Sequence, residues 1–167
     1  MVTKERFKQG LTLAQYLEQM GTNKDKFVEF LGEVAISPED KQALAKLGTK
    51  LNVLVITEDW CGDALYNVPV LAKLVEGNPD VEMRIFLRDK NPDLMDQYLN
   101  QGLYRSIPVF AFFDESMKEV ARFIERPPAQ TEELEKKMLE TRRALRGERY
   151  LEWRGGVVKE IRSLLKA

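Results

Sequence analysis

The feature that most restricts the fold of this chain is a pair of strand-like segments joined by a helix-like one. Residues 52–57 (NVLVIT) are β-branched and continuously apolar, which is typical of a strand buried on both faces of a sheet. Residues 61–74 carry apolar side chains at helical spacing, and residues 81–87 (VEMRIFL) alternate as a strand does. Because two strands connected through a helix form a βαβ unit, we expect parallel pairing and a right-handed crossover.

The first fifty residues are expected to be helical. Thr12 and Gln15 have the spacing of a capping box, which predicts a helix start at that point. Ser37 followed by Pro38 is a second typical start, with a hydroxyl cap and a proline in the first helical position.

Two further strands are expected in the middle of the chain. A short helix should follow Asn91-Pro92-Asp93 over residues 94–102. Residues 107–113 (IPVFAFF) predict a third strand, and the short turn after it favours an antiparallel fourth strand over residues 118–124. The predicted fold class is therefore α/β, with a central mixed sheet of about four strands flanked by helices.

The C-terminal tail is expected to be helical and charged. Thr131-Glu132-Glu133 is predicted to begin a long helix, and Gly147 and Gly155-Gly156 to divide the tail into helical pieces. Residues 136–167 carry ten basic and four acidic side chains, which we interpret as a solvated helical face. We expect residues 1–50 to pack on the same domain as a core of residues 51–140. Residues 141–167 would then form a helical extension. We expect the tail from Thr131 onward to pack on the N-terminal helices or to pair with a second subunit as a homodimer.

Composition excludes several classes of function. The 26 basic and 27 acidic residues nearly cancel, so we expect no binding to nucleic acid or to an anionic membrane. No uncharged apolar run approaches the roughly 18 residues of a membrane span, and the N-terminus lacks the apolar stretch of a signal peptide. The absence of histidine removes histidine bases and histidine metal ligands. With a single cysteine there is no intrachain disulfide, and we expect a cytoplasmic protein with no metal and no cofactor.

The single cysteine, Cys61, lies where the first strand passes into the helix. Backbone N–H groups gather at a helix N-terminus, and they stabilise a thiolate there. A free cysteine is otherwise often a small buried apolar residue. The position of Cys61 between Trp60 and Gly62 favours exposure, so we interpret it as a reactive thiol.

Three short motifs resemble the thioredoxin family. Trp60-Cys61-Gly62 is similar to the start of the family's Trp-Cys-Gly-Pro-Cys site, Pro69 to its helix-kinking proline, and Ser106-Ile107-Pro108 to its cis-proline loop. The resemblance covers roughly residues 51–140 and implies a thioredoxin-like fold, in which the Ile107–Pro108 bond is cis and lies beside Cys61. It makes Cys61 the candidate catalytic residue, and the candidate substrate-binding residues are Trp60, Gly62, Ile107 and Pro108.

The chain departs from the family pattern at four places. Ala64 stands where the second cysteine would be, and Asp63 stands where the intervening proline would be. Val55 takes the place of the family's buried acid, and no glycine is evident at residues 124–126 beside the site. A standard dithiol–disulfide cycle within one chain is therefore ruled out.

Acidic residues near Cys61 are expected to limit its acidity. The helix end favours a negative charge by about 0.3–1 kcal/mol, whereas a carboxylate about 6 Å away costs roughly 0.7 kcal/mol. Glu58, Asp59 and Asp63 are close in sequence, and no Lys or Arg occurs from residue 52 to residue 70. We therefore expect a thiol acidity that is only modestly enhanced, with Asp59 and Asp63 as candidate modulators. Asp63 also fits the ordinary role of an acid in the first turn of a helix.

Two functions remain open. In the first, the Cys61 thiolate attacks a disulfide or mixed disulfide, and a low-molecular-weight thiol from solution resolves the intermediate. In the second, the chain is a thioredoxin-like binding module that kept the groove and lost the redox cycle. Iron–sulfur binding, as in single-cysteine glutaredoxins, is a weaker alternative because Asp63-Ala64 does not match their Phe-Ser. We predict the oxidoreductase, with a low-molecular-weight thiol or a protein thiol or disulfide as its partner.

Overall fold

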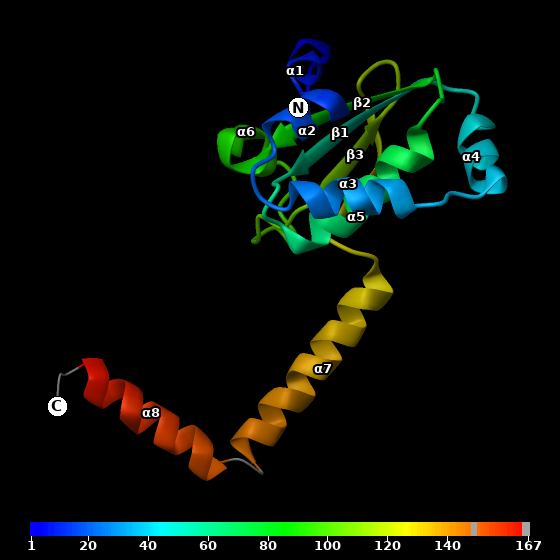
Figure 1. Cartoon of the computed structure of the whole chain (residues 1–167). Coiled ribbons are helices and arrows are strands. Elements are labelled where there is room, and N and C mark those ends of the chain that lie inside the picture. Colours follow the sequence, from blue (N-terminus) through cyan, green and yellow to red (C-terminus); the bar gives the residue numbers. More distant parts are fainter. Residues whose placement is uncertain (148–149, 165–167) are drawn as a thin grey trace. The chain divides into compact units, whose positions relative to one another are not determined.

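The structure is a computed structural model that describes residues 1–147 and 150–164. The chain divides into two compact units, Met1–Arg126 and Pro127–Ala167. The first unit contains the sheet and all the segments that surround Cys61 (Figure 1).

The first unit is built on a four-stranded sheet in the order β2-β1-β3-β4. The central strand β1 (Leu51–Thr57) pairs in parallel with β2 (Val81–Leu87) and antiparallel with β3 (Val109–Phe113). Strand β4 (Glu119–Ile124) pairs antiparallel with β3 and ends the sheet. The mixed sheet and the parallel pairing of the two predicted βαβ strands are confirmed.

Helices cover both faces of this sheet (Figure 1). The helices of the first unit are α1 (Lys4–Lys8), α2 (Leu13–Gln19), α3 (Lys24–Glu33), α4 (Pro38–Ala45), α5 (Gly62–Val75) and α6 (Pro92–Met95). A single 3-10 turn, η1 (Arg88–Lys90), follows β2. The two predicted helix starts are confirmed: Thr12 and Gln15 form a capping box on α2, and the Ser37 hydroxyl accepts from the Asp40 N–H on α4.

Strand β1 divides the core because its side chains alternate between the two faces of the sheet. Leu54 and Ile56 belong to a cluster with buried residues of α1 and α6. Val53 and Val55 belong to the opposite cluster, with buried residues of α2, α3 and α5. All seven residues of β1 are buried, as expected of a strand that is covered on both faces. Cys61 packs against both clusters, so it lies where the two halves of the core meet.

The second unit consists of α7 (Pro128–Arg146) and α8 (Tyr150–Leu164). The prediction that Gly147 ends the first of these helices is confirmed. The prediction that Thr131 begins it is wrong, because α7 starts at Pro128, whose fixed φ and missing N–H suit the first position of a helix. The prediction of a break at Gly155-Gly156 is also wrong. Two glycines cost a helix about 1 kcal/mol each relative to alanine, and α8 continues through both.

The short helix after Asn91 is also shorter than predicted. It ends at Met95 rather than continuing to residue 102. Gln101 and Gly102 both have positive φ (53° and 72°), and the Asn100 N–H donates to the Tyr104 carbonyl at 2.7 Å. The chain therefore turns back on itself there, which a continuing helix would not allow. No helix in the described parts of either unit has the length and apolar character needed to cross a membrane.

Candidate active site around Cys61

Cys61 is the residue that caps the N-terminus of α5. Its backbone is extended (φ −80°, ψ 121°), and its carbonyl accepts the first helical hydrogen bond, from the Leu65 N–H at 3.0 Å. The side chain is half-buried. Strand β1 therefore delivers the thiol to the end of a helix, where unpaired N–H groups point outward.

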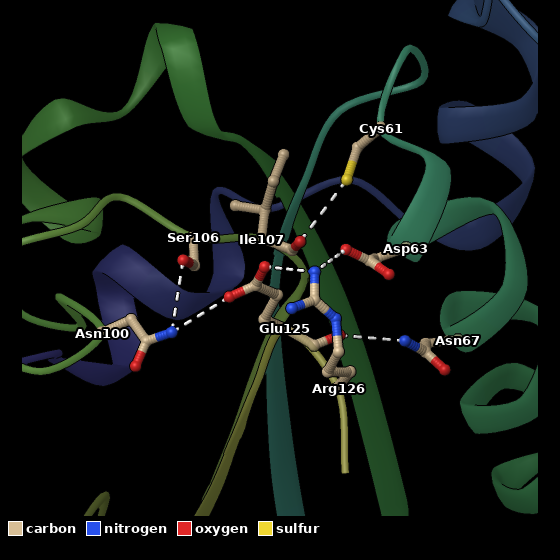
Figure 2. A network of polar contacts seen from close by, with 8 residues as sticks. All are labelled: Cys61, Asp63, Asn67, Asn100, Ser106, Ile107, Glu125 and Arg126. Atoms are coloured by element: carbon tan, nitrogen blue, oxygen red, sulfur yellow. Dashed lines mark hydrogen bonds and ion pairs between the residues drawn. The ribbon is translucent and has the colours of Figure 1, made fainter. Parts of the chain in front are cut away.

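The thiol faces the loop that precedes β3. Cys61 Sγ donates to the Ile107 carbonyl oxygen at 3.4 Å, across 46 residues of sequence (Figure 2). The Ile107–Pro108 peptide bond is cis. Ile107 and Pro108 are both buried, and the structure brings them together with Cys61 as the resemblance implies.

Burial raises the pKa of the Cys61 thiol above its ordinary value. The N–H groups of Ala64 and Asp63 oppose this increase, and the Asp63 carboxylate adds to it. The expectation of a modestly enhanced acidity is therefore wrong. Desolvation is the largest effect on this thiol, and it outweighs the N–H groups at the helix end. It arises from packing in the folded protein and cannot be read from the residues next to Cys61 in the sequence.

Trp60 and Gly62 leave one side of the thiol open. Trp60 is 46% exposed, and the Arg88 guanidinium stacks on its ring at 4.7 Å from the centroid. Gly62 is exposed, and a Cβ added there would meet no atom within 4 Å. A ligand can therefore approach past both residues.

The two candidate modulators have different partners. The Asp59 carboxylate accepts the backbone N–H groups of Gly21 and Thr22 at 2.8 and 2.9 Å, so it anchors the loop between α2 and α3. The Asp63 carboxylate instead accepts from Arg126, with Nη2 and Oδ2 2.6 Å apart. Of these two carboxylates, only that of Asp63 is among the charges that shift the pKa of Cys61.

Arg126 is the centre of a polar network that the sequence did not reveal (Figure 2). Its guanidinium also pairs with the Glu125 carboxylate, and the Arg126 side chain is only 19% exposed. Asn100 Nδ2 donates to Glu125 Oε2 at 3.0 Å and to Ser106 Oγ at 3.3 Å. Asn67, on α5, donates to the Glu125 carbonyl at 2.9 Å. The network therefore ties the start of α5, the loop before β3 and the end of β4 to one another.

Glu125 has the backbone conformation of a glycine. Its φ is 67°, in the left-handed region that costs a residue with a side chain roughly 1–2 kcal/mol. Its N–H donates to the Pro108 carbonyl at 2.7 Å, so the end of β4 bonds directly to the loop beside Cys61. The thioredoxin family has a glycine in this segment, at residues 124–126 of this chain. Here Glu125 adopts the left-handed conformation that a glycine would adopt without steric cost.

A further acid, Glu58, directly follows β1 and is buried. It is 8% exposed, and its Oε1 accepts from the Asp89 N–H at 2.8 Å. Burial raises the pKa of this carboxyl above its ordinary range. Within the described ranges, no three cysteine or carboxylate side chains gather in a way that could hold a metal ion.

Comparison with known proteins identifies the family. The family model described as Thioredoxin matches residues 10–142, which is most of the chain. The chain belongs to the thioredoxin family. The match includes the N-terminal helices from α2 onward, which lie outside the segment that the motifs alone indicated. No curated protein matches this member of the family.

Solved structures agree with the fold of this thioredoxin-family protein. One is a protein of unknown function from Pseudomonas aeruginosa, with 24% identity, a TM-score of 0.66, and coverage of 77% of this chain and 80% of that chain. An HIV epitope-scaffold matches with the same identity, TM-score and coverage. At this identity the likeness supports the fold and carries no information about substrate.

Proposed function

We propose that this thioredoxin-family protein is a thiol–disulfide oxidoreductase that works through Cys61 alone and uses an external thiol as its resolving partner. The observation that carries the proposal is the contact of Cys61 Sγ with the Ile107 carbonyl, at the N-terminus of α5 and beside an exposed Trp60. In this arrangement the one thiol of the chain lies against a backbone segment that could also align a substrate.

The reaction has two exchange steps. The Cys61 thiolate attacks one sulfur of a disulfide, a mixed disulfide forms on Cys61, and the other sulfur leaves as a thiolate that takes a proton from water. A small thiol from solution then attacks the mixed disulfide and releases Cys61 as a thiolate. In each cycle one sulfur of the substrate disulfide leaves as a thiol, and the other leaves joined to the small thiol in a new disulfide; a second small thiol in solution can exchange with that disulfide to complete the reduction. Ala64, which is buried one helical turn away, has no sulfur for an internal attack.

Partners and location follow from this chemistry. The substrate is a low-molecular-weight disulfide or a protein disulfide, and Trp60, Gly62, Ile107 and Pro108 would contact it. A single thiol that must return to the reduced state requires a pool of reduced thiols, so we propose the cytoplasm as its compartment.

A binding module without redox turnover is the second candidate function. The observation in its favour is the raised pKa of Cys61, since a thiol that stays protonated near neutral pH is a poor nucleophile. On this alternative the backbone at Ile107 would pair with an extended peptide, and Cys61 would act only as a packed apolar side chain.

Intact mass after incubation with an oxidised small thiol separates the two functions. The wild-type protein should gain one thiol by mixed disulfide, and Cys61→Ser should gain none. Ala64→Cys should instead lose two hydrogens as an internal disulfide, because positions three apart face each other on a helix. An unmodified wild-type protein at pH 8–9, where more of the thiol is ionised, would leave the binding module as the function.

A further inference from the structure

A depression of about 280 Å³, lined mainly by charged residues, lies next to Trp60 of the Cys61 site, and the proposed mechanism does not use it. It is lined by Arg88, Asp89, Pro92 and Arg105. Arg88 stacks on the Trp60 ring at 4.7 Å and donates through Nη1 to the Arg105 carbonyl at 3.4 Å. Arg105 immediately precedes the Ser106-Ile107-Pro108 loop. The depression is therefore connected to both halves of the Cys61 site.

Arg88 is held in place before any ligand arrives. Its side chain is 25% exposed, and it is fixed by the Trp60 ring, by the Arg105 carbonyl and by Asp89, whose Oδ1 lies 2.8 Å from Nη2. Its charge reaches the thiol, because Arg88 is among the groups that lower the pKa of Cys61. A guanidinium fixed in this way loses little freedom when it binds a carboxylate.

The acids that now pair with the two arginines are exposed. Asp89 has 59% of its side chain exposed, and Asp96, which binds Arg105 at 2.7 and 2.9 Å, has 50% exposed. Exposed ion pairs are weak and are screened by salt. A ligand carboxylate can therefore take guanidinium donors from these acids while water solvates the released side chains.

The other flank of Cys61 is the more acidic of the two, because Asp89 and Asp96 match the two arginines at the depression charge for charge. On that other flank, Asp63 and Glu125 share the single guanidinium of Arg126, so it carries one excess negative charge. An anionic ligand is repelled from that side and is directed towards the depression beside Trp60.

We propose that the depression between Arg88 and Arg105 binds the carboxylate of a small disulfide while one sulfur of that disulfide reacts with Cys61. Guanidinium groups bind carboxylates through paired, charge-assisted hydrogen bonds, and two of them meet at this depression. The substrate class is thus a carboxylate-bearing low-molecular-weight disulfide. This assignment rests on the proposed function, because it names the substrate of the same thiol.

The test compares two disulfides that differ in charge. The rate of Cys61 modification is measured by intact mass with 3,3′-dithiodipropionate, which carries two carboxylates, and with 2-hydroxyethyl disulfide, which is neutral. Each rate is divided by the rate of the same disulfide with free 2-mercaptoethanol, so that intrinsic reactivity cancels. The wild-type ratio of anionic to neutral rate should exceed one. In the double variant Arg88→Gln/Arg105→Gln it should fall about tenfold, as expected for the loss of charge-assisted hydrogen bonds.

Lys90→Gln is the matched control. It removes a positive charge two residues from Arg88, and Lys90 is exposed and does not line the depression. This variant should keep the wild-type ratio within about twofold, since an exposed charge outside the depression acts only at long range. A ratio that stays unchanged in the double variant, or that falls equally in Lys90→Gln, would overturn the assignment.

The failure of the proposed function would look different. If neither disulfide modified Cys61, the oxidoreductase would be rejected, and the anion site would be judged by itself on Cys61→Ser. In that protein, NMR titration with 3-(methylthio)propionate should shift the Arg88 and Arg105 Nε–H signals in a saturable way. The neutral alcohol 3-(methylthio)propanol should not. Equal or absent shifts with the two compounds would reject the site.

Discussion

The two flanks of Cys61 are assembled in different ways. On one flank, Trp60, Gly62 and the Ile107–Pro108 loop leave an open approach to the sulfur. On the other flank, Arg126 closes the site by joining Asp63 to Glu125. The open flank exposes Trp60 and Gly62 and is suited to binding, whereas the closed flank is a partly buried ionic network whose first effect is on stability. Cys61 can therefore be accessible from the Trp60 side while the ion pairs of Arg126 hold the other side in place.

The largest expected effect comes from breaking the closed flank. Arg126→Met keeps most of the side-chain volume but leaves two carboxylates without their common partner. We expect a loss of about 2–3 kcal/mol in the free energy of unfolding, below the cost for a fully buried pair because Asp63 is 38% exposed. Urea unfolding followed by circular dichroism measures this loss.

Arg105→Met is the matched comparison for that experiment. Arg105 also binds a carboxylate, but both partners are about half exposed (52% and 50%). Its loss should change the free energy of unfolding by no more than about 0.5 kcal/mol. Equal effects of the two substitutions would mean that the Arg126 network contributes no more than a surface ion pair does.

Features that depend on local sequence patterns could be predicted, whereas contacts between residues far apart in the sequence could not. The strand over residues 81–87 was predicted with its observed bounds, and the strand over residues 52–57 begins one residue earlier, at Leu51. Both depend on local periodicity, which a sequence displays directly. The family resemblance added the prediction that the Ile107–Pro108 loop lies beside Cys61. Two motifs at a known separation indicate a contact in the fold, which the periodicity of single segments cannot do.

The closed flank could not be predicted in this way. Asp63 and Arg126 are 63 residues apart, and neither has a local pattern that indicates a partner. The acidity of Cys61 was misjudged for a related reason. Its desolvation arises from packing against both core clusters, which depends on the assembled fold rather than on neighbours in sequence.

A smaller effect is expected at Glu125, where the backbone is left-handed (φ 67°). Glu125→Gly and Glu125→Ala both remove the carboxylate and its bonds to Arg126 and Asn100, so the difference between them isolates the backbone. Glycine should be the more stable of the two by about 1 kcal/mol, because it adopts positive φ without steric cost. At an ordinary helix or strand position the order is reversed. Thermal unfolding of the two variants side by side would decide it, and a more stable alanine variant would contradict the left-handed conformation.

The smallest expected effect is that of the Asp63 carboxylate, on the closed flank, on the pKa of the Cys61 thiol. Burial and the Asp63 carboxylate both raise the pKa of Cys61, so the thiolate fraction near neutral pH is below that of an ordinary cysteine. The rate of iodoacetamide alkylation should therefore rise with pH through the region above about 8.5, which is the ordinary pKa of cysteine. At pH 7 it should be slower than the rate for a cysteine in an unstructured peptide.

Asp63→Asn removes one negative charge from beside the sulfur. It should move this curve to lower pH and make alkylation at pH 7 faster than in the wild type, because the Asp63 charge raises the pKa of the thiol. Glu76→Gln, at the opposite end of α5, removes the same charge at a distance and should leave the curve in place. If the Asp63→Asn curve coincided with that of the wild type, Arg126 would already neutralise the carboxylate completely, and the two flanks would be electrostatically independent.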